Sequence, residues 1–180
     1  MFRRTVDREL QQIRRVLEDL RNLARPIPLE RFPVDVARLA GEVAESMRLP
    51  AEAAGLSLDC VTPPGPVVVE GDVFALGRVL RNLILNAIQA TAPGGRLALQ
   101  VWLTEHRVRL TVSDTGCGIP PDRLGAIFED FVTTKRRGLG LGLPIARKIV
   151  EQLGGTIRVE SEVGRGTAFT IEFPEHAKHG

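Results

Sequence analysis

The chain has 180 residues, 43% of them hydrophobic, and a formal net charge of +2 at pH 7. This length allows one domain with a full core plus a short appendage, and the near-neutral charge gives no reason to expect a nucleic-acid partner. No apolar run approaches the roughly 20 residues that span a bilayer, the start lacks a signal-peptide pattern, and Cys60 and Cys117 lack the spacing of metal ligands. We therefore expect a reduced, cytoplasmic setting and no membrane segment in this chain, which is compatible with a membrane-attached parent protein.

Residues 5–25 are predicted to form one amphipathic helix. Its apolar positions follow a 4-3-4-3-4 spacing, which is a heptad seam, and its other positions are rich in Arg, Glu and Gln. A seam this narrow is typical of a helix that packs on another helix; it fits either a dimerisation helix or a helix folded back on its own domain. Prolines in the run Arg25-Pro-Ile-Pro28 end it. The seam consists of Val6, Leu10, Ile13, Leu17, Leu20 and Ala24.

Helices and strands alternate after this segment. The pattern predicts a helix over 34–54 that ends near Gly55, followed by short strands over 56–61 and 67–70. Asp72 then stands where an N-cap is needed for the next helix.

Two asparagines, Asn82 and Asn86, lie one turn apart on this next helix, which is otherwise apolar and ends at Ala92-Pro-Gly-Gly95. Residues four apart share one face of a helix, and an amide is costly to bury without a hydrogen-bond partner. Either local backbone groups satisfy the two amides or a ligand does. Mg²⁺ with a phosphate chain would suit them, because Mg²⁺ prefers oxygen ligands and usually shares them with a nucleotide.

The second half of the chain is predicted to contain two hairpins and two further helices. Most strands therefore pair antiparallel, and the predicted fold is α+β: a two-layer α/β sandwich in which helices cover one face of a mixed sheet. The elements are a hairpin of strands 97–103 and 107–113, a short helix over 122–128, a helix over 144–153, and a hairpin of strands 156–160 and 167–173.

Two glycine clusters lie between these elements. Asp114-Thr-Gly-Cys-Gly-Ile119 follows a strand, and Gly138-Leu-Gly-Leu-Gly-Leu143 precedes a helix. Glycine allows close backbone approach to a ligand, and backbone amides that lead into a helix N-terminus can bind phosphate. Together with the paired asparagines, the clusters favour a nucleotide site.

With these motifs the chain resembles the ATP-binding catalytic domain of a bacterial sensor histidine kinase, and thereby the superfamily that includes gyrase B, Hsp90 and MutL. The resemblance covers roughly residues 33–174 and implies the Bergerat ATP-binding fold, with ATP and Mg²⁺ as cofactors. The lid sequence is most similar to the nitrogen-regulation type of kinase. The matching motifs are an N box (Asn82–Ala90), a G1 box (Asp114–Ile119), an F box with the start of the ATP lid (Phe128–Phe131 and Thr133–Lys135), a G2 box (Gly138–Leu143) and the hairpin Gly164–Thr167.

The resemblance implies a role for each site residue at the base end of the nucleotide. Asp114 is expected to accept a hydrogen bond from the adenine amino group. Gly116 and Gly118 are expected to let the backbone approach the base and the ribose, and Thr167 to support Asp114 through its hydroxyl or a water molecule.

At the phosphate end, the resemblance implies that Asn86 is the magnesium ligand and that Asn82 contacts phosphate. Lys135 is expected to reach the terminal phosphates as a point charge. The three glycines that hinge the lid and donate amides to the phosphates are Gly138, Gly140 and Gly142.

Asn82 also bears on the reaction. In gyrase-like ATPases of this superfamily, a glutamate at this position activates water, and an amide cannot take up a proton at neutral pH. The chain is therefore expected to hydrolyse ATP poorly and to act as a protein-histidine kinase, with Asn82 and Lys135 as catalytic residues that position the phosphates for in-line transfer.

The acceptor histidine is missing: His106, His176 and His179 do not match the family's acceptor pattern. We expect a catalytic fragment or natural truncation, inactive alone, whose partners are a dimerisation and phosphoacceptor domain and, indirectly, a response regulator. The alternatives are a non-catalytic nucleotide-binding regulatory or scaffold module and, less compatible with Asn82, an ATP-driven clamp. The expected domains are a hairpin helix with its linker (1–28), the ATP-binding catalytic domain (29–175) and a polar tail (176–180).

Overall fold

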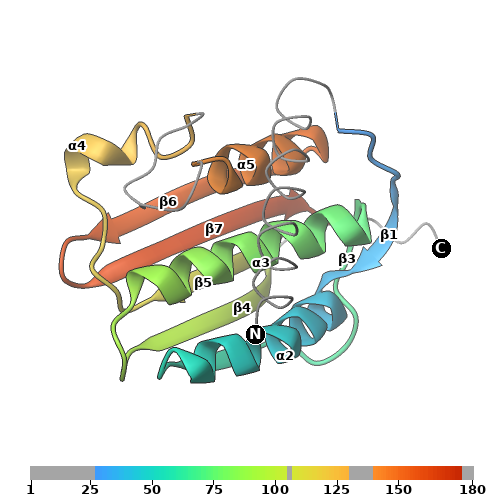
Figure 1. The fold of residues 1–180 in the computed structure, drawn as a ribbon. Coiled ribbons are helices and arrows are strands. Elements are labelled where there is room, and N and C mark those ends of the chain that lie inside the picture. Colours follow the sequence, from blue (N-terminus) through green and yellow to red (C-terminus); the bar gives the residue numbers. More distant parts are fainter. Residues whose placement is uncertain (1–26, 105–106, 130–139, 176–180) are drawn as a thin grey trace, which may run out of the picture.

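The computed structural model describes residues 27–104, 107–129 and 140–175. A five-stranded mixed sheet forms one layer, and helices α2, α3 and α5 lie over one of its faces (Figure 1). This confirms the predicted α+β sandwich, whereas the helix predicted over 5–25 lies outside the described residues. The helices are α2 (Val36–Ala53), α3 (Val73–Ala90), α4 (Pro121–Leu124) and α5 (Gly142–Gln152); the strands are β1 (Phe32–Asp35), β2 (Ser57–Val61), β3 (Val68–Gly71), β4 (Arg96–Thr104), β5 (Arg107–Asp114), β6 (Thr156–Glu162) and β7 (Gly166–Pro174).

The strand order in the large sheet is β2-β4-β5-β7-β6. β2 runs parallel to β4, and all other neighbours are antiparallel. Both predicted hairpins, β4–β5 and β6–β7, are therefore confirmed. The β5 and β7 strands lie next to each other although about 60 residues separate them in sequence, so the middle of the sheet joins the two halves of the chain.

The predicted start of the first helix, at residue 34, is wrong. Residues 32–35 form strand β1, which pairs with β3, and α2 begins only at Val36. Asp35 sets this boundary, because its Oδ1 accepts hydrogen bonds from the backbone N–H groups of Ala37 and Val67, each at 3.1 Å. The helix predicted over 122–128 is also too long: only the single turn α4 is helical, and it ends at Leu124.

Asp72 caps α3 as predicted. Its Oδ1 accepts hydrogen bonds from the backbone N–H groups of Phe74, at 2.9 Å, and Ala75, at 3.0 Å. Its second oxygen accepts from the Glu30 N–H at 3.2 Å. One carboxylate therefore fixes the start of α3 and holds the chain where it enters the domain.

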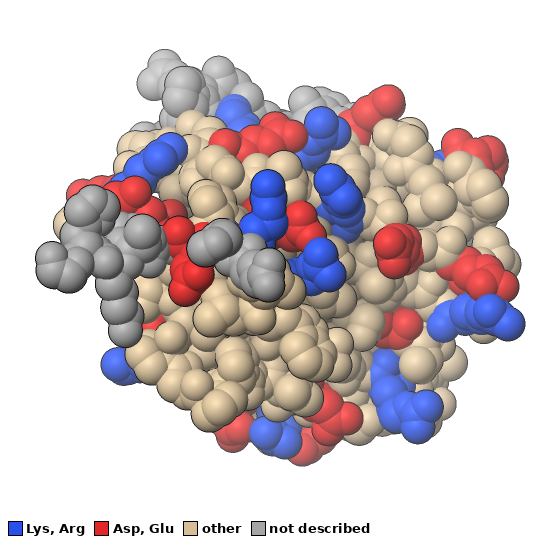
Figure 2. Space-filling view, turned by 180° about the vertical axis from the view of Figure 1, so that it is seen from behind, with Lys and Arg blue, Asp and Glu red and all other residues tan. Residues whose placement is uncertain are grey.

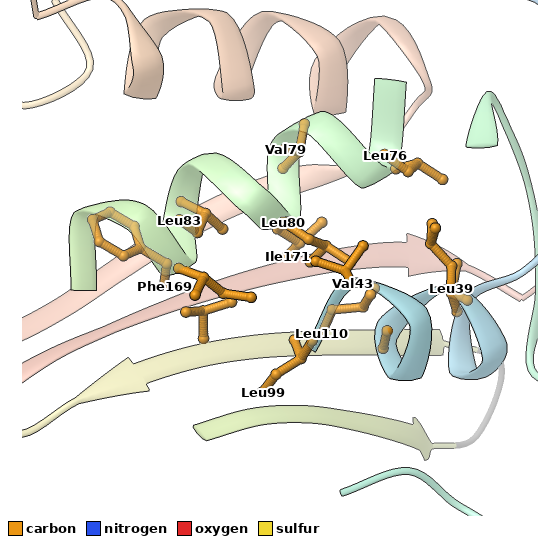
Figure 3. Close-up of a cluster of buried hydrophobic side chains, with 14 of the residues drawn as sticks. Leu39, Val43, Leu76, Val79, Leu80, Leu83, Leu99, Leu110, Phe169 and Ile171 are labelled. Carbon is orange, nitrogen blue, oxygen red and sulfur yellow. The ribbon is translucent and has the colours of Figure 1, made fainter. Parts of the chain in front are cut away.

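The core lies on both sides of α3. This helix packs against α2, α5 and the sheet, and its side chains interlock with those of β4, β5 and β7 (Figure 3). Val79, Leu83 and Ile84 are fully buried, and Leu80 is nearly so. Full burial of a leucine stabilises the fold by about 1.5–3 kcal/mol, so α3 is held by packing on most of its circumference. None of the helices in the described ranges has the length and apolar composition needed to cross a bilayer.

The other face of the sheet carries no described helix. Figure 2 shows this side, on which Lys, Arg, Asp and Glu side chains lie among uncharged ones. Arg109 on β5 and Glu172 on β7 form an ion pair there at 2.6 Å. A hollow of about 440 Å³ on this face is lined by residues that include Trp102, Arg109 and Glu172. It is separated from the predicted site residues by the thickness of the sheet.

Replacing Leu83 by alanine should lower the free energy of unfolding by about 2–5 kcal/mol, because it leaves a cavity at a fully buried position. Chemical denaturation with circular dichroism measures this. Leu49→Ala is the matched control, since Leu49 is 75% exposed on α2, and it should change stability by less than about 0.5 kcal/mol. Equal effects of the two substitutions would show that α3 is not the centre of the core.

Candidate functional site

Side chains on the helix side of the sheet stand in rows across β5, β7 and β6. Two rows are apolar and belong to the core, and the next row, at the end of β5, is polar. Because all three rows follow the strand register, the polar residues face the helix side as the apolar ones do. The apolar rows are Leu110–Ile171–Ile157 and Val112–Phe169–Val159, and the polar row is Asp114–Thr167–Ser161.

Asp114 is half-buried at the end of β5. Its Oδ1 accepts a hydrogen bond from the Gly116 N–H at 2.8 Å, and the backbone of Thr167 donates another to the carboxylate. Burial raises the pKa of the Asp114 carboxyl, although these two hydrogen bonds oppose the shift. An ionised carboxylate has about four acceptor positions, so Asp114 can still accept a hydrogen bond from a ligand.

Gly116 and Gly118 hold the loop after Asp114 against its surroundings. A Cβ on Gly116 would collide with the Ala90 carbonyl oxygen at the end of α3, and a Cβ on Gly118 would collide with the Glu162 carbonyl oxygen on the β6–β7 hairpin. Gly118 also has a φ of 71°, which side chains disfavour. These glycines are therefore required by packing within the protein, whatever their distance from a bound ligand.

Backbone hydrogen bonds link the same loop to the end of α3 and to the β6–β7 hairpin. The Cys117 N–H donates to the Ala90 carbonyl at 3.0 Å, and the Gly164 N–H donates to the Cys117 carbonyl at 2.9 Å. Ala90 lies one turn after Asn86 on α3. These two hydrogen bonds therefore connect the helix that carries the asparagines with the loop that follows Asp114.

Asn82 and Asn86 are both half-buried on α3. A Cβ placed on Gly142, the first residue of α5, would lie 3.9 Å from the Asn82 side-chain nitrogen. The structure thus brings Asn82 to the N-terminal end of α5, where unpaired backbone N–H groups favour anions. Gly140, just before this helix, has a φ of 70°, which glycine adopts without strain. Lys135 and Gly138, by contrast, lie outside the described residues.

Phe128 anchors the segment that precedes residues 130–139. Its ring packs edge-on against Phe169, with centroids 6.3 Å apart, and the Arg147 guanidinium of α5 lies 5.7 Å from its centroid. Phe128, the first residue of the F box, is thus packed between β7 and α5. Phe131 lies outside the described residues.

Sequence reasoning missed Ser161, the third member of the polar row. Its Oγ accepts a hydrogen bond from the Ile119 N–H at 2.8 Å and lies 2.9 Å from Thr167 Oγ1. The contact depends on the register that pairs residue 161 with residue 167. The predicted hairpin came near it, but its first strand, 156–160, ends one residue before Ser161.

The chain is similar to known kinases and ATPases. The family profile described as histidine kinase-, DNA gyrase B- and HSP90-like ATPase matches residues 71–177. Sporulation kinase A of Bacillus subtilis is 36% identical over 168 residues, which cover 93% of this chain and 28% of that protein. The sensor histidine kinase ZraS of Escherichia coli is 35% identical over 167 residues, covering 93% and 36%. This chain thus spans roughly a third of the length of these relatives.

Two solved structures show the same likeness in three dimensions. Full-length ShkA in complex with AMPPNP superimposes with a TM-score of 0.84 at 34% identity, covering 97% of this chain and 38% of that one. The catalytic domain of the histidine kinase ThkA superimposes with a TM-score of 0.74 at 33% identity, covering 81% of this chain and 96% of that one. The chain belongs to the family of histidine kinase-, DNA gyrase B- and HSP90-like ATPases and contains a catalytic ATP-binding domain of the sensor histidine kinase kind.

Proposed function

We propose that this chain binds Mg-ATP and transfers its γ-phosphoryl group to a histidine on a separate dimerisation domain, as the catalytic part of a two-component sensor kinase. The observation that carries the proposal is a pair of polar sites, one at the end of β5 and one at the N-terminal end of α5. The half-buried Asp114 carboxylate with acceptor positions to spare lies at one, and Asn82 beside the first turn of α5 lies at the other. An adenine amino group suits the first, and a phosphate chain suits the second.

The roles at the phosphate end follow from the donor types. The Asn86 side-chain oxygen would hold Mg²⁺, and the Asn82 amide would contact phosphate. Among the described residues no group of three or more His, Cys, Asp or Glu side chains could hold a metal ion, so the ion would take its other ligands from phosphate and water. Bound Mg²⁺ would neutralise phosphate charge. Lys135 and the amides of Gly138, Gly140 and Gly142 would contact the terminal phosphates.

The choice of acceptor rests on Asn82. It occupies the position of the water-activating glutamate of related ATPases, and its amide cannot act as a base at neutral pH. Positioning and charge neutralisation are sufficient for phosphoryl transfer to a histidine nitrogen that is itself a nucleophile. The phosphohistidine on the dimerisation domain would then donate its phosphoryl group to a response regulator.

We also propose the division of the chain into a hairpin helix and linker (1–28), a catalytic domain (29–175) and a polar tail (176–180). Ile27 in the linker and Leu29 in the catalytic domain are both partly buried against the core, so the chain packs on the domain from the end of the linker onward. The assignment to the nitrogen-regulation type rests on the sequence Thr133-Thr-Lys135 alone.

Removing the Asn86 amide should weaken magnesium-dependent nucleotide binding. Calorimetric titration of AMPPNP into wild type should show binding that requires Mg²⁺, and Asn86→Ala should weaken it about tenfold or more, which corresponds to about 1.4 kcal/mol. Gln100→Ala is the matched control: Gln100 pairs with Thr111 on the face of the sheet away from α2, α3 and α5, so its amide should not affect nucleotide binding. Binding that is equal with and without Mg²⁺ in both proteins would refute the metal role.

Asp114→Asn should weaken nucleotide binding without lowering the stability of the fold. The raised pKa means that protonation of Asp114 favours the folded state, so its ionised form opposes folding above that pKa. The neutral isostere should therefore leave the free energy of unfolding at pH 7 unchanged or higher, while nucleotide affinity falls by about tenfold or more. In wild type, affinity should also fall as acidification protonates the carboxylate. A loss of more than about 1 kcal/mol of stability in Asp114→Asn would identify a structural carboxylate instead.

Phosphoryl transfer should occur only in trans. When the chain is mixed with a separate hairpin domain that carries an acceptor histidine, the label of γ-³²P-ATP should appear on the hairpin, with little free phosphate and no label on the chain. Asn82→Ala should reduce this transfer. Binding without transfer would favour the scaffold alternative, and stoichiometric labelling of the chain alone would show that the acceptor lies within it.

A further inference from the structure

The hydroxyl of Ser161 has three polar neighbours. Its Oγ donates to the Gly166 carbonyl at 2.8 Å, accepts from the Ile119 N–H at 2.8 Å, and lies 2.9 Å from Thr167 Oγ1. A hydroxyl has one proton and two acceptor lone pairs. Since the Ser161 proton goes to the Gly166 carbonyl, the Thr167 hydroxyl must be the donor in the remaining contact.

This contact fixes the direction in which the Thr167 hydroxyl donates its proton. The residue is only 6% exposed, so its hydroxyl has little access to water. With its single proton directed to Ser161, Thr167 Oγ1 can only accept further hydrogen bonds. Its cross-strand neighbour Asp114 can also only accept when ionised. The polar row therefore presents acceptors alone along β5 and β7, and it demands a ligand that brings N–H donors.

We propose that Ser161 is a positioning residue that sets nucleobase specificity, by holding the Thr167 hydroxyl as an acceptor so that the site takes 6-amino purines and rejects 6-oxo purines. The inference rests on the proposed nucleotide site and adds to it the source of base selectivity. Adenine offers an amino group at position 6. Hypoxanthine and guanine place a carbonyl oxygen there, which would face acceptors and remain unpaired, and such a mismatch at a buried polar site is strongly unfavourable.

Ser161 also holds the loop that contains Gly116 and Gly118, since its Oγ accepts a hydrogen bond from the N–H of Ile119, the next residue. Without the Ser161 hydroxyl, two changes follow. The Thr167 hydroxyl can turn and donate its proton to a 6-oxo group, and the Ile119 N–H loses its partner. The first changes which base is accepted, and the second can be observed in the ligand-free protein.

The test compares Mg-ADP with Mg-IDP, which differ at purine position 6 and cannot be turned over. Calorimetry on wild type should show a preference for ADP of about 100-fold or more, and Ser161→Ala should reduce this ratio by about tenfold or more. Ser161→Cys keeps the size of the side chain but donates and accepts poorly, so it should reduce the ratio as well if the alanine variant folds badly. Ser161→Thr keeps the hydroxyl and should retain the preference.

Thr170→Ala is the matched control. Thr170 and Thr111 form a hydroxyl pair at 3.3 Å across the same two strands, β7 and β5, but on the helix-free face, so its loss should leave the ADP-to-IDP ratio unchanged. In the ligand-free protein, hydrogen exchange of the Ile119 amide should become faster in Ser161→Ala and not in Thr170→Ala.

The outcomes separate the two proposals. If Ser161→Ala and Ser161→Cys weaken ADP and IDP equally, so that the ratio stays at its wild-type value, Ser161 has only a structural role and the inference is wrong while the nucleotide site stands. If wild type binds neither nucleotide, the proposed function and this inference both fail.

Discussion

Helix α3 is buried on most of its circumference, and this packing fixes the positions of the neighbouring elements and of the site. The helix is packed against α2, α5 and the sheet, and its apolar residues fill the centre of the core. A helix enclosed in this way has little freedom to rotate or slide, since interiors are densely packed and a shift would open cavities. The half-buried amides of Asn82 and Asn86 are therefore held in fixed positions, with Asn82 beside the first turn of α5. Asp72 fixes the start of the same helix and holds the entering chain.

The second constraint is the register of the sheet. Two apolar rows cross β5, β7 and β6, and the polar row follows them at the end of β5. Register alone thus places Asp114 and Ser161 on either side of Thr167. The loop that contains Gly116 and Gly118 then packs against the end of α3 and the β6–β7 hairpin. Only glycine fits there, because the loop backbone contacts the carbonyl groups of Ala90 and Glu162. Burial raises the pKa of the Asp114 carboxyl even though two backbone hydrogen bonds favour its charged form, and a carboxylate perturbed in this way is typical of a site that binds a ligand.

The sequence predicted the features that depend on local pattern. The period of α3, the Asp72 cap and both hairpins follow from nearby residues, and all were found. Strand β1 was missed because it is only four residues long, includes Pro33, and is a strand only through its pairing with β3. Ser161 was missed because its role arises from contacts rather than from a motif: two lie within its own hairpin, to Gly166 and Thr167, and the third is to Ile119, 42 residues away. The motifs named the polar residues Asp114 and Asn86, but they could not show that Gly116 and Gly118 are required by contacts inside the protein.

In the proposed complex, one nucleotide spans the polar row and the face of α3 that carries Asn82 and Asn86. The most direct test is NMR spectroscopy of the ¹⁵N-labelled chain with AMPPNP and Mn²⁺ in place of Mg²⁺. The backbone signals of Gly116 and Ile119 should shift with nucleotide, and the side-chain amide signal of Asn86 should broaden most with Mn²⁺ and only when nucleotide is present. Nucleotide-induced shifts confined to the helix-free face around Trp102 and Arg109, or Mn²⁺ broadening that does not depend on nucleotide, would contradict this arrangement.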